Sequence, residues 1–371
     1  MVAVNPVMVS RSPYASLATT AKLMKRYALI LALSALLVAP VARAQPGVVL
    51  GINDPRFTYQ WSANWPMLFQ VEPVQIETGM QGLNTIPPWQ NILMIAQEKV
   101  DGVDPTWPGG RAIVAADTAA LVKAHPNVRE VQVWNEPNYP YDQAWGGWVG
   151  TADQYVALVA AVHDAVKAVN PSVLVLAGGY HPDSMLPPYR NGLSLSLGDF
   201  TAAMKRLYAS GGRTTPIMDG FSYHPYWNWK PAITNAVAKW MNVNWRGLPQ
   251  PAPNHGFKLW WTESGAWSSG AQWGTPPMVL GLDGQAARVR DVLSECVNNK
   301  YIGGCFNYLL SDEPDSAHAW AWKSGLFDTG GHAKPAVYAF KQVERDNQSA
   351  LWFATHPIVK IKHRIPRHKR H

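Results

Sequence analysis

A regular alternation of short apolar, β-branched runs and longer helical segments limits the fold more than any other feature of the sequence. About eight predicted strands alternate with helices in one run, with no linker and no internal repeat inside it. This pattern predicts the α/β class and a single-domain (β/α)8 TIM barrel over residues 45–345. The predicted strands lie at 48–52, 74–77, 92–96, 131–133, 173–176, 220–223, 258–263 and 304–308, and the predicted helices lie at 61–70, 112–124, 157–169, 199–209, 233–243, 285–298 and 334–343.

One of these strands ends in a chemically distinctive run, from Val131 to Asn138, with the sequence Val-Gln-Val-Trp-Asn-Glu-Pro-Asn. Pro137 has no N–H and disfavours helix at the residue before it, so the strand must stop there. The pair Asn135-Glu136 is therefore presented at the carboxyl end of a strand. Parallel α/β barrels place their chemistry at that end.

A second strand, far along the chain, ends in the same way. The apolar run from Lys258 reaches Glu263 and is stopped by Ser264-Gly265. Two carboxyl groups at two strand ends are the arrangement that glycoside hydrolysis needs, because one donates a proton and the other attacks the sugar or activates water. Two nearby carboxyl groups cannot both stay ionised at low cost, so one pKa is raised, and that group can act as the acid. The chemistry requires neither a metal nor an organic cofactor.

The two ends of the chain differ in composition from the rest. Residues 1–44 carry five basic residues and no acid, and they contain an apolar stretch from Tyr27 to Val38 that is too short to span a bilayer. Ala42-Arg43-Ala44 then fits a cleavage site, which predicts a signal peptide and a secreted or periplasmic protein. Residues 1–23 are typical of an upstream extension, with Met24 as the alternative start. The alternative is a retained membrane anchor. Residues 346–371 become polar and then basic, and we expect a disordered tail.

The formal net charge of +7 belongs to these ends. Five of the 32 Lys and Arg residues lie in residues 1–44 and six lie in 358–371, which leaves 21 basic residues against 25 acidic ones in the body. A nucleic-acid-binding domain would need a basic face of its own, so we expect no nucleic-acid partner. The basic tail could contact an anionic cell surface. We expect the protein to be a monomer.

Two further residue types bear on the fold and on the ligand. Cys296 and Cys305 are the only cysteines, and an oxidising compartment would allow them to form a disulfide. The sequence holds 18 Trp, many of them just after predicted strands. Aromatic rings in such loops offer flat apolar faces that suit the C–H faces of sugars, although many can equally pack the loops. The selected substrate-binding candidates are Trp267 and Trp320.

With both glutamates placed, the sequence resembles the retaining glycoside hydrolases of clan A, which are barrels with the acid/base on strand four and the nucleophile on strand seven. The resemblance covers roughly residues 48–345, and the run from Trp134 to Asn138 is its most specific part. Tyr308 to Asp312, then His318, then Ser324-Gly325-Leu326-Phe327, is similar to the last loop of family 39-like bacterial members.

The resemblance implies a role for each matching residue. Glu136 would be the general acid/base and Glu263 the nucleophile, and Asn135 would hydrogen-bond the 2-hydroxyl of the sugar. His224 and Tyr226 follow the sixth predicted strand in the His-x-Tyr pattern of the clan, in which the Tyr contacts the nucleophile and the His lines the cleft.

The sequence departs from the clan at two places. The basic residue near strand two has no counterpart, because the second predicted strand ends at Glu77. The Trp that often ends strand eight is not obvious, and Tyr308 and Trp320 are the candidates. These departures concern the sugar subsites more than the reaction.

Three functions fit the sequence. The first is a secreted retaining glycosidase that acts on a polysaccharide or oligosaccharide. The second is a catalytically weak polysaccharide-binding barrel of the cell envelope, which the presence of both glutamates disfavours. The third is an envelope-associated or nucleic-acid-associated protein held by the basic tail. The sequence alone does not identify the sugar, the linkage or endo versus exo action.

Overall fold

The chain divides into two units, Met1–Pro46 and Gly47–His371, and only the second contains described residues. The predicted leader, the helix predicted at 61–70 and residues 356–371 lie outside the described part. The computed structural model describes residues 48–54, 75–80, 83, 91–97, 103–138, 148–181, 195–226, 230–270, 279–314 and 322–355.

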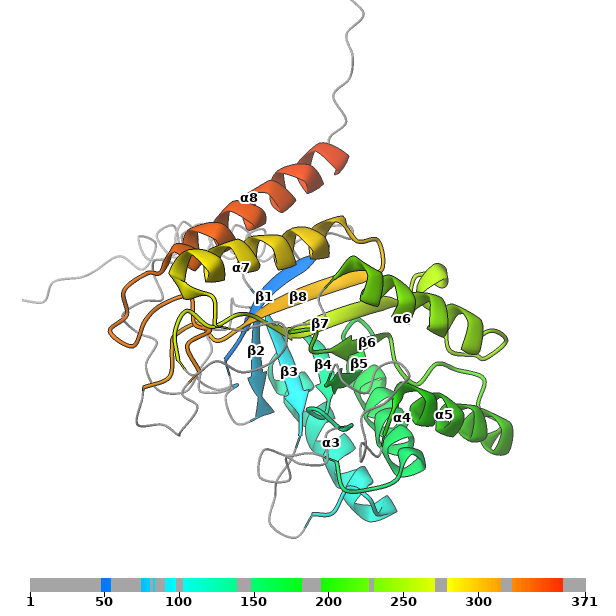
Figure 1. Cartoon of the computed structure of the whole chain (residues 1–371). Coiled ribbons are helices and arrows are strands. Elements are labelled where there is room, and N and C mark those ends of the chain that lie inside the picture. The colour runs from blue at the N-terminus through cyan, green and yellow to red at the C-terminus, as the bar shows by residue number, and fades with distance from the viewer. Residues whose placement is uncertain are drawn as a thin grey trace, which may run out of the picture. The chain divides into compact units, whose positions relative to one another are not determined.

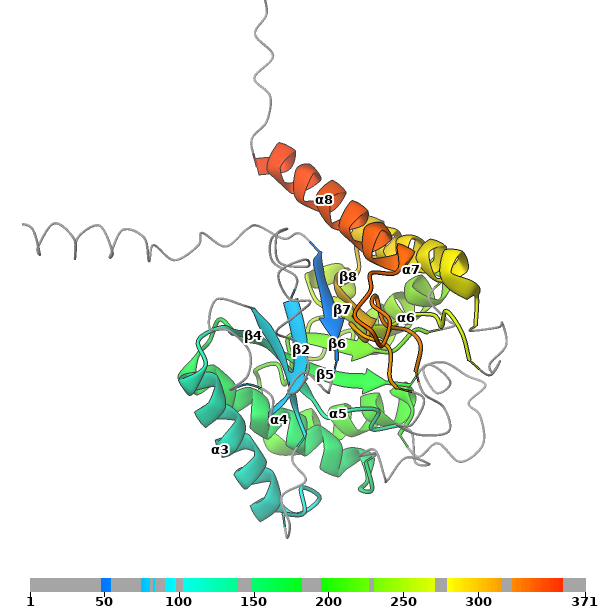
Figure 2. The same cartoon turned by 90° about the vertical axis from the view of Figure 1, so that its left-hand side faces the viewer.

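Eight parallel strands form a closed barrel in which each strand pairs with its neighbour in sequence and β8 pairs with β1 (Figures 1 and 2). This confirms the predicted parallel α/β architecture. The strands are β1 (Val49–Asn53), β2 (Gln75–Gly79), β3 (Ile92–Ala96), β4 (Val128–Val133), β5 (Leu174–Tyr180), β6 (Gly220–Tyr223), β7 (Lys258–Ser264) and β8 (Ile302–Tyr308).

The helices of the described part follow β3 to β8 in turn and cover the outside of the barrel (Figure 1). Local sequence explains several of their starts. A capping box formed by Thr151 and Gln154 begins α4, and another formed by Ser196 and Asp199 begins α5. The helices are α3 (Pro108–Ala124), α4 (Ala152–Val169), α5 (Leu197–Gly211), α6 (Pro231–Asn244), α7 (Gly281–Asn298) and α8 (Pro335–Thr355), and a short 3-10 helix, η4 (Pro253–His255), precedes β7.

Apolar side chains pack in two places, inside the barrel and between the barrel and the helices. Leu93, Leu176, Trp260 and Phe306 form a separate apolar cluster from β3, β5, β7 and β8, as expected for an inward-facing layer. Gly304 makes room for the indole ring, since a Cβ at that position would lie 2.4 Å from Trp260. The larger core lies between the strands and the helices.

The predicted start of a disordered tail at residue 346 is wrong. Helix α8 continues to Thr355, and both views show it lying along α7 (Figures 1 and 2). The polar run after Arg345 predicts an end, but residues 346–356 contain no Gly or Pro that would stop the helix. Asn347 also has a fixed role, because its side-chain amide donates to the Val48 carbonyl (3.0 Å).

Cys296 of α7 and Cys305 of β8 form a disulfide with their Cα atoms 6.3 Å apart, which is the pairing that the sequence allows. The bond ties the seventh helix to the strand that follows it. Within the described residues, no helix is both long enough and apolar enough to cross a membrane.

Candidate active site

The barrel interior becomes polar toward the carboxyl ends of the strands. Gln132, Ser222, Thr262 and Asn307 are buried there, on β4, β6, β7 and β8, together with Asn53 of β1. Each of these residues costs free energy to bury unless it is hydrogen-bonded. A set of polar residues from several strands therefore indicates that this end of the barrel has a role beyond packing.

Strained backbone gathers at the same end. The non-glycine residues with positive φ in the described part are Trp134 (74°), Glu136 (40°), Tyr226 (21°) and Leu309 (70°). All four follow the ends of β4, β6 and β8. Such conformations cost about 1–3 kcal/mol each and persist where the surrounding structure enforces them, often at functional sites.

Hydrogen bonds of the backbone and of a neighbouring side chain fix the position of Glu136. Its backbone N–H donates to the Gly179 carbonyl at the end of β5 (3.0 Å). Asn138, two residues later, is fully buried and exchanges two hydrogen bonds with the His181 backbone (2.8 and 2.9 Å). The Asn-Glu-Pro-Asn loop is thereby fixed to the neighbouring strand, and the Glu136 side chain keeps 17% of its surface exposed.

Glu263 lies inside β7 and is enclosed more tightly. The Asn53 amide donates to its Oε1 (3.2 Å), and the Tyr226 hydroxyl donates to its Oε2 (2.5 Å). The clan pattern implies the contact with Tyr226. Asn53 lies at the end of the first strand, where the sequence predicts no particular role for it. Only the closure of the barrel brings it to Glu263.

His224 lies between the two carboxyl groups. Its Nδ1 is 2.8 Å from Glu136 Oε1 and 3.3 Å from Glu263 Oε2, and its side chain is fully buried. This geometry favours the tautomer with the proton on Nδ1, which can donate to either carboxylate. Burial lowers the pKa of His224, and the nearby charge of Glu263 acts in the opposite direction.

The pKa of Glu263 is raised in this environment. Burial is the main cause, and the Glu136 carboxyl group adds to the effect. His224 and the hydrogen bonds from Tyr226 and Asn53 lower the pKa and so partly offset the burial. Burial also raises the pKa of Tyr226 well above that of a free tyrosine, so its hydroxyl stays protonated as a hydrogen-bond donor.

The three ionisable side chains are close to one another. One atom each of Glu136, His224 and Glu263 lies within 4.8 Å of the other two, and among the described residues this is the one such trio of possible metal ligands. A metal bound there would occupy both carboxylates. It would therefore compete with acid–base and nucleophilic chemistry instead of assisting it.

The remaining predicted ligand-binding residues have different surroundings. Asn135 directly precedes Glu136, and its Oδ1 is buried without a hydrogen bond from the described part of the chain. Trp267 is only 3% exposed and stacks on Tyr226, with ring centroids 5.9 Å apart. Trp322 packs against Trp267 and Tyr308 and keeps more exposed surface. Trp320 lies outside the described residues.

Comparisons with known proteins agree with this geometry at the level of the fold. A family 39 glycoside hydrolase from the gut symbiont Bacteroides cellulosilyticus WH2 matches with a TM-score of 0.53 and 19% identity, over 81% of this chain and 64% of that one. In its fold, this chain is similar to a family 39 glycoside hydrolase. It spans less than two thirds of the length of that protein.

Two other solved structures match less well. A family 128 endo-β-1,3-glucanase from Amycolatopsis mediterranei gives a TM-score of 0.48 at 15% identity, over 80% of this chain and 99% of that one. A glucosidase from Croceicoccus marinus gives 0.49 at 16% identity, over 72% and 52%. No family model matches the sequence, and neither does any curated protein. At these identities the likeness concerns the fold alone.

Proposed function

We propose that the protein is a retaining glycoside hydrolase, with Glu136 as the acid/base and Glu263 as the nucleophile. The observation that carries the proposal is the approach of two carboxyl groups from the ends of β4 and β7 to within 4.8 Å, at the carboxyl end of the barrel. Retaining enzymes place their carboxyl groups about 5–5.5 Å apart, whereas inverting enzymes leave roughly 6.5–9.5 Å for a water molecule.

In the first step, a Glu263 oxygen would attack the anomeric carbon while Glu136 protonates the glycosidic oxygen. The C–O bond to the leaving group breaks, and an ester bond to Glu263 forms. In the second step, Glu136, now a carboxylate, would take a proton from water as that water attacks the anomeric carbon. The ester breaks, the sugar leaves with its original configuration, and both glutamates return to their starting states.

The surrounding residues fit this division of roles. Burial raises the pKa of Glu263, but the contacts from His224, Tyr226 and Asn53 lower it and so favour the ionised form that attack requires. The assignment of Glu136 as the acid rests on its position after β4 and on its greater exposure, not on the pKa of Glu263. Asn53 and Tyr226 each hold one oxygen of Glu263, which orients the attacking group. His224 contacts both carboxyl groups and can pass its hydrogen bond from one to the other as their charges change. Asn135, with an unsatisfied buried Oδ1, is suited to a hydroxyl of the bound sugar. Tyr308 and Trp322 offer an aromatic surface beside Tyr226.

We also propose that the protein is exported. The support is the order of basic residues, an apolar stretch and Ala-x-Ala in residues 24–44. N-terminal sequencing of exported protein should find a start near Gln45, and an intact segment from Tyr27 to Val38 would contradict the proposal.

The test of activity is a panel of aryl glycosides and polysaccharides, with the anomeric configuration of the first product followed by NMR. We expect hydrolysis of at least one β- or α-linked series with net retention. Binding of a polysaccharide without hydrolysis of any substrate would instead support a carbohydrate-binding barrel. Net inversion would contradict the assignment of Glu263 as a nucleophile.

A further inference from the structure

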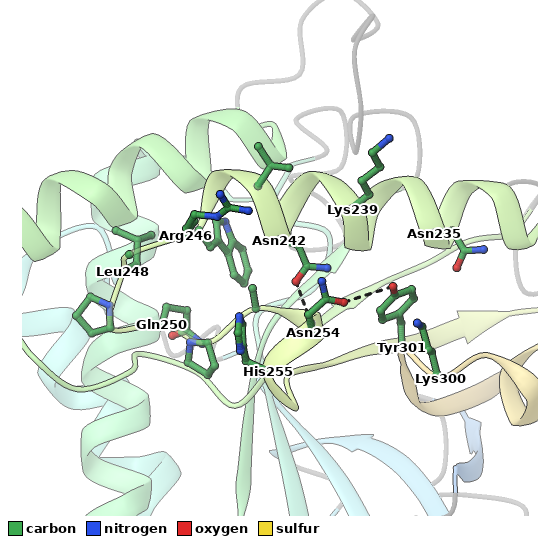
Figure 3. A pocket seen from close by; sticks show the side chains of 16 residues that line it. Asn235, Lys239, Asn242, Arg246, Leu248, Gln250, Asn254, His255, Lys300 and Tyr301 are labelled. Atoms are coloured by element: carbon green, nitrogen blue, oxygen red, sulfur yellow. Dashed lines mark hydrogen bonds between the residues drawn. The ribbon is translucent and has the colours of Figure 1, made fainter.

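A pocket of about 780 Å³, shown in Figure 3, lies away from the two glutamates, which are at the carboxyl end of the barrel. It is formed by α6, by the segment after α6 that includes η4, and by Lys300 and Tyr301 just before β8. The Leu259 N–H at the start of β7 donates to the Tyr301 carbonyl (2.8 Å), which places the pocket at the amino ends of β7 and β8. Its volume lies within the usual range for ligand sites.

One wall of the pocket is a polar stripe of α6 and its end. Asn235, Lys239, Asn242 and Arg246 follow one another at intervals of four, three and four residues, which places them on one face of the helix. Figure 3 shows Lys239, Asn242 and Arg246 along this edge of the pocket. Arg246 follows the carboxyl end of α6, where the helix dipole alone favours a cation. Lys239 is an exposed residue in the middle of the helix.

The facing wall is held in a fixed arrangement. The Asn254 N–H donates to the Asn242 side-chain oxygen (2.9 Å), and the Tyr301 hydroxyl donates to the Asn254 side-chain oxygen (3.4 Å). The Lys300 ammonium lies 4.9 Å from the centroid of the Tyr301 ring. These contacts link the helix, the η4 segment and the turn before β8 into one surface (Figure 3).

The lining of the pocket is basic, whereas residues 45–357 as a whole carry more acidic than basic residues. The described lining contains Lys239, Arg246, His255 and Lys300 and no Asp or Glu. The sequence has no acidic residue between Asp219 and Glu263. An acid beyond the lining, Glu295, accepts a hydrogen bond from Asn299 (2.8 Å).

We propose that this pocket binds an acidic saccharide, that is, a glycan segment bearing carboxylate or sulfate groups. The cations would pair with the anionic groups. The side-chain oxygens of Asn235, Asn242 and Asn254 already accept hydrogen bonds from the protein, so their NH2 groups are the donors available to sugar hydroxyls. One face of the Tyr301 ring is covered by Lys300, which disfavours the stacking of a nucleobase there. The site goes beyond the proposed hydrolysis, since a glycan held at the amino end would tether the enzyme to a polymer and leave the catalytic end open.

The experiment is calorimetric titration of the full chain with an oligogalacturonate, a neutral maltooligosaccharide and inorganic phosphate. We expect the oligogalacturonate alone to bind well, with an affinity that falls as salt rises. In the double variant Lys239→Ala/Lys300→Ala, we expect about tenfold weaker binding or more, because two charge-assisted contacts are lost. Hydrolysis of a small aryl glycoside should stay unchanged, and the melting temperature should fall only slightly, because the variant loses the contact of Lys300 with the Tyr301 ring.

The matched control is Lys123→Ala/Lys205→Ala, which removes two exposed lysines on α3 and α5 and should bind like the wild type. Hydrogen exchange should show protection of residues 239–255 on binding. Three results would overturn the proposal: equal binding of the neutral oligosaccharide, equal binding of phosphate, or unchanged binding by the pocket variant. Displacement by single-stranded DNA at equal affinity would also overturn it, in favour of a general polyanion site.

Discussion

The two glutamates at the carboxyl end of the barrel are held in opposite ways. Glu263 lies within β7, its side chain is 11% exposed, and both of its oxygens are bound by side chains from β1 and the end of β6. Glu136 lies beyond its strand, on strained backbone with φ of 40°, and its side chain is more exposed. His224 is the contact that they share.

This difference matches what the two proposed roles demand. A nucleophile benefits from a fixed position and from loss of water, which strengthens nearby electrostatic interactions. An acid/base must meet a leaving group and then a water molecule, so it needs access to the cleft. The backbone strain at Glu136 is the cost of directing a residue past the strand end toward its partner.

Removal of each carboxyl group should give the largest effects and separate the roles. Glu263→Ala should lower kcat by about 10⁴-fold or more on every substrate, because the first bond cannot form. Glu136→Ala should cost about 10²–10⁴-fold on poor leaving groups and much less on activated aryl glycosides. Added azide should rescue Glu136→Ala and give a glycosyl azide of retained configuration, as measured by NMR.

Glu295→Ala, which removes a carboxyl group on α7, is the control and should hydrolyse substrate like the wild type. If azide instead rescued Glu263→Ala to a retained product, the two roles would have to be exchanged.

A substitution at Gly179 should disturb the position of Glu136. A Cβ there would lie 2.6 Å from Gln132 Nε2 and 3.2 Å from His224 Nε2, at a φ of 69°. Because the Gly179 carbonyl also holds the Glu136 N–H, we expect Gly179→Ala to lower kcat by about 10- to 100-fold and stability by about 1–3 kcal/mol. Steady-state kinetics and thermal melts measure both effects.

Gly212 provides a matched control for the backbone effect. Its φ is 61°, and a Cβ there would meet nothing within 4 Å. Gly212→Ala should therefore show a comparable conformational cost with normal kcat. Equal losses of activity in the two variants would mean that Gly179 does not position the site.

Loss of the hydrogen bond from Tyr226 to Glu263 should change the pH dependence of activity. The hydrogen bond from Tyr226 lowers the pKa of Glu263, which burial has raised. Attack requires ionised Glu263, so activity is lost as the pH falls through this pKa. In Tyr226→Phe the pKa should rise further, so the acidic limb of kcat/KM should move to higher pH.

Tyr338→Phe, at a tyrosine of α8 that is 67% exposed, should leave the profile in place. An acidic limb that stays fixed or moves to lower pH in Tyr226→Phe would show that this hydrogen bond does not favour the charged form of Glu263.

The sequence predicts the strands and both glutamates because their signals are local. An apolar run that ends at Glu-Pro or Glu-Ser marks a strand end, and a count of such runs places Glu136 after the fourth and Glu263 on the seventh. The role of Asn53 has no local signal, since its partner Glu263 is 210 residues away and meets it only when β8 pairs with β1. The end of α8 is predicted wrongly because the polar residues after Arg345 resemble a helix end, although no Gly or Pro occurs between Arg345 and Pro357 to stop the helix.

Covalent trapping tests the central claim most directly. The probe is the 2-deoxy-2-fluoro analogue of the aryl glycoside that the enzyme hydrolyses fastest, because the fluorine slows the second step and lets the glycosyl-enzyme accumulate. We predict that mass spectrometry of the digested protein will find one added fluorosugar on the peptide that contains Glu263, and that Glu263→Ala will acquire none. A label on Glu136, or hydrolysis of the parent glycoside with no covalent adduct and inverted product, would contradict the account.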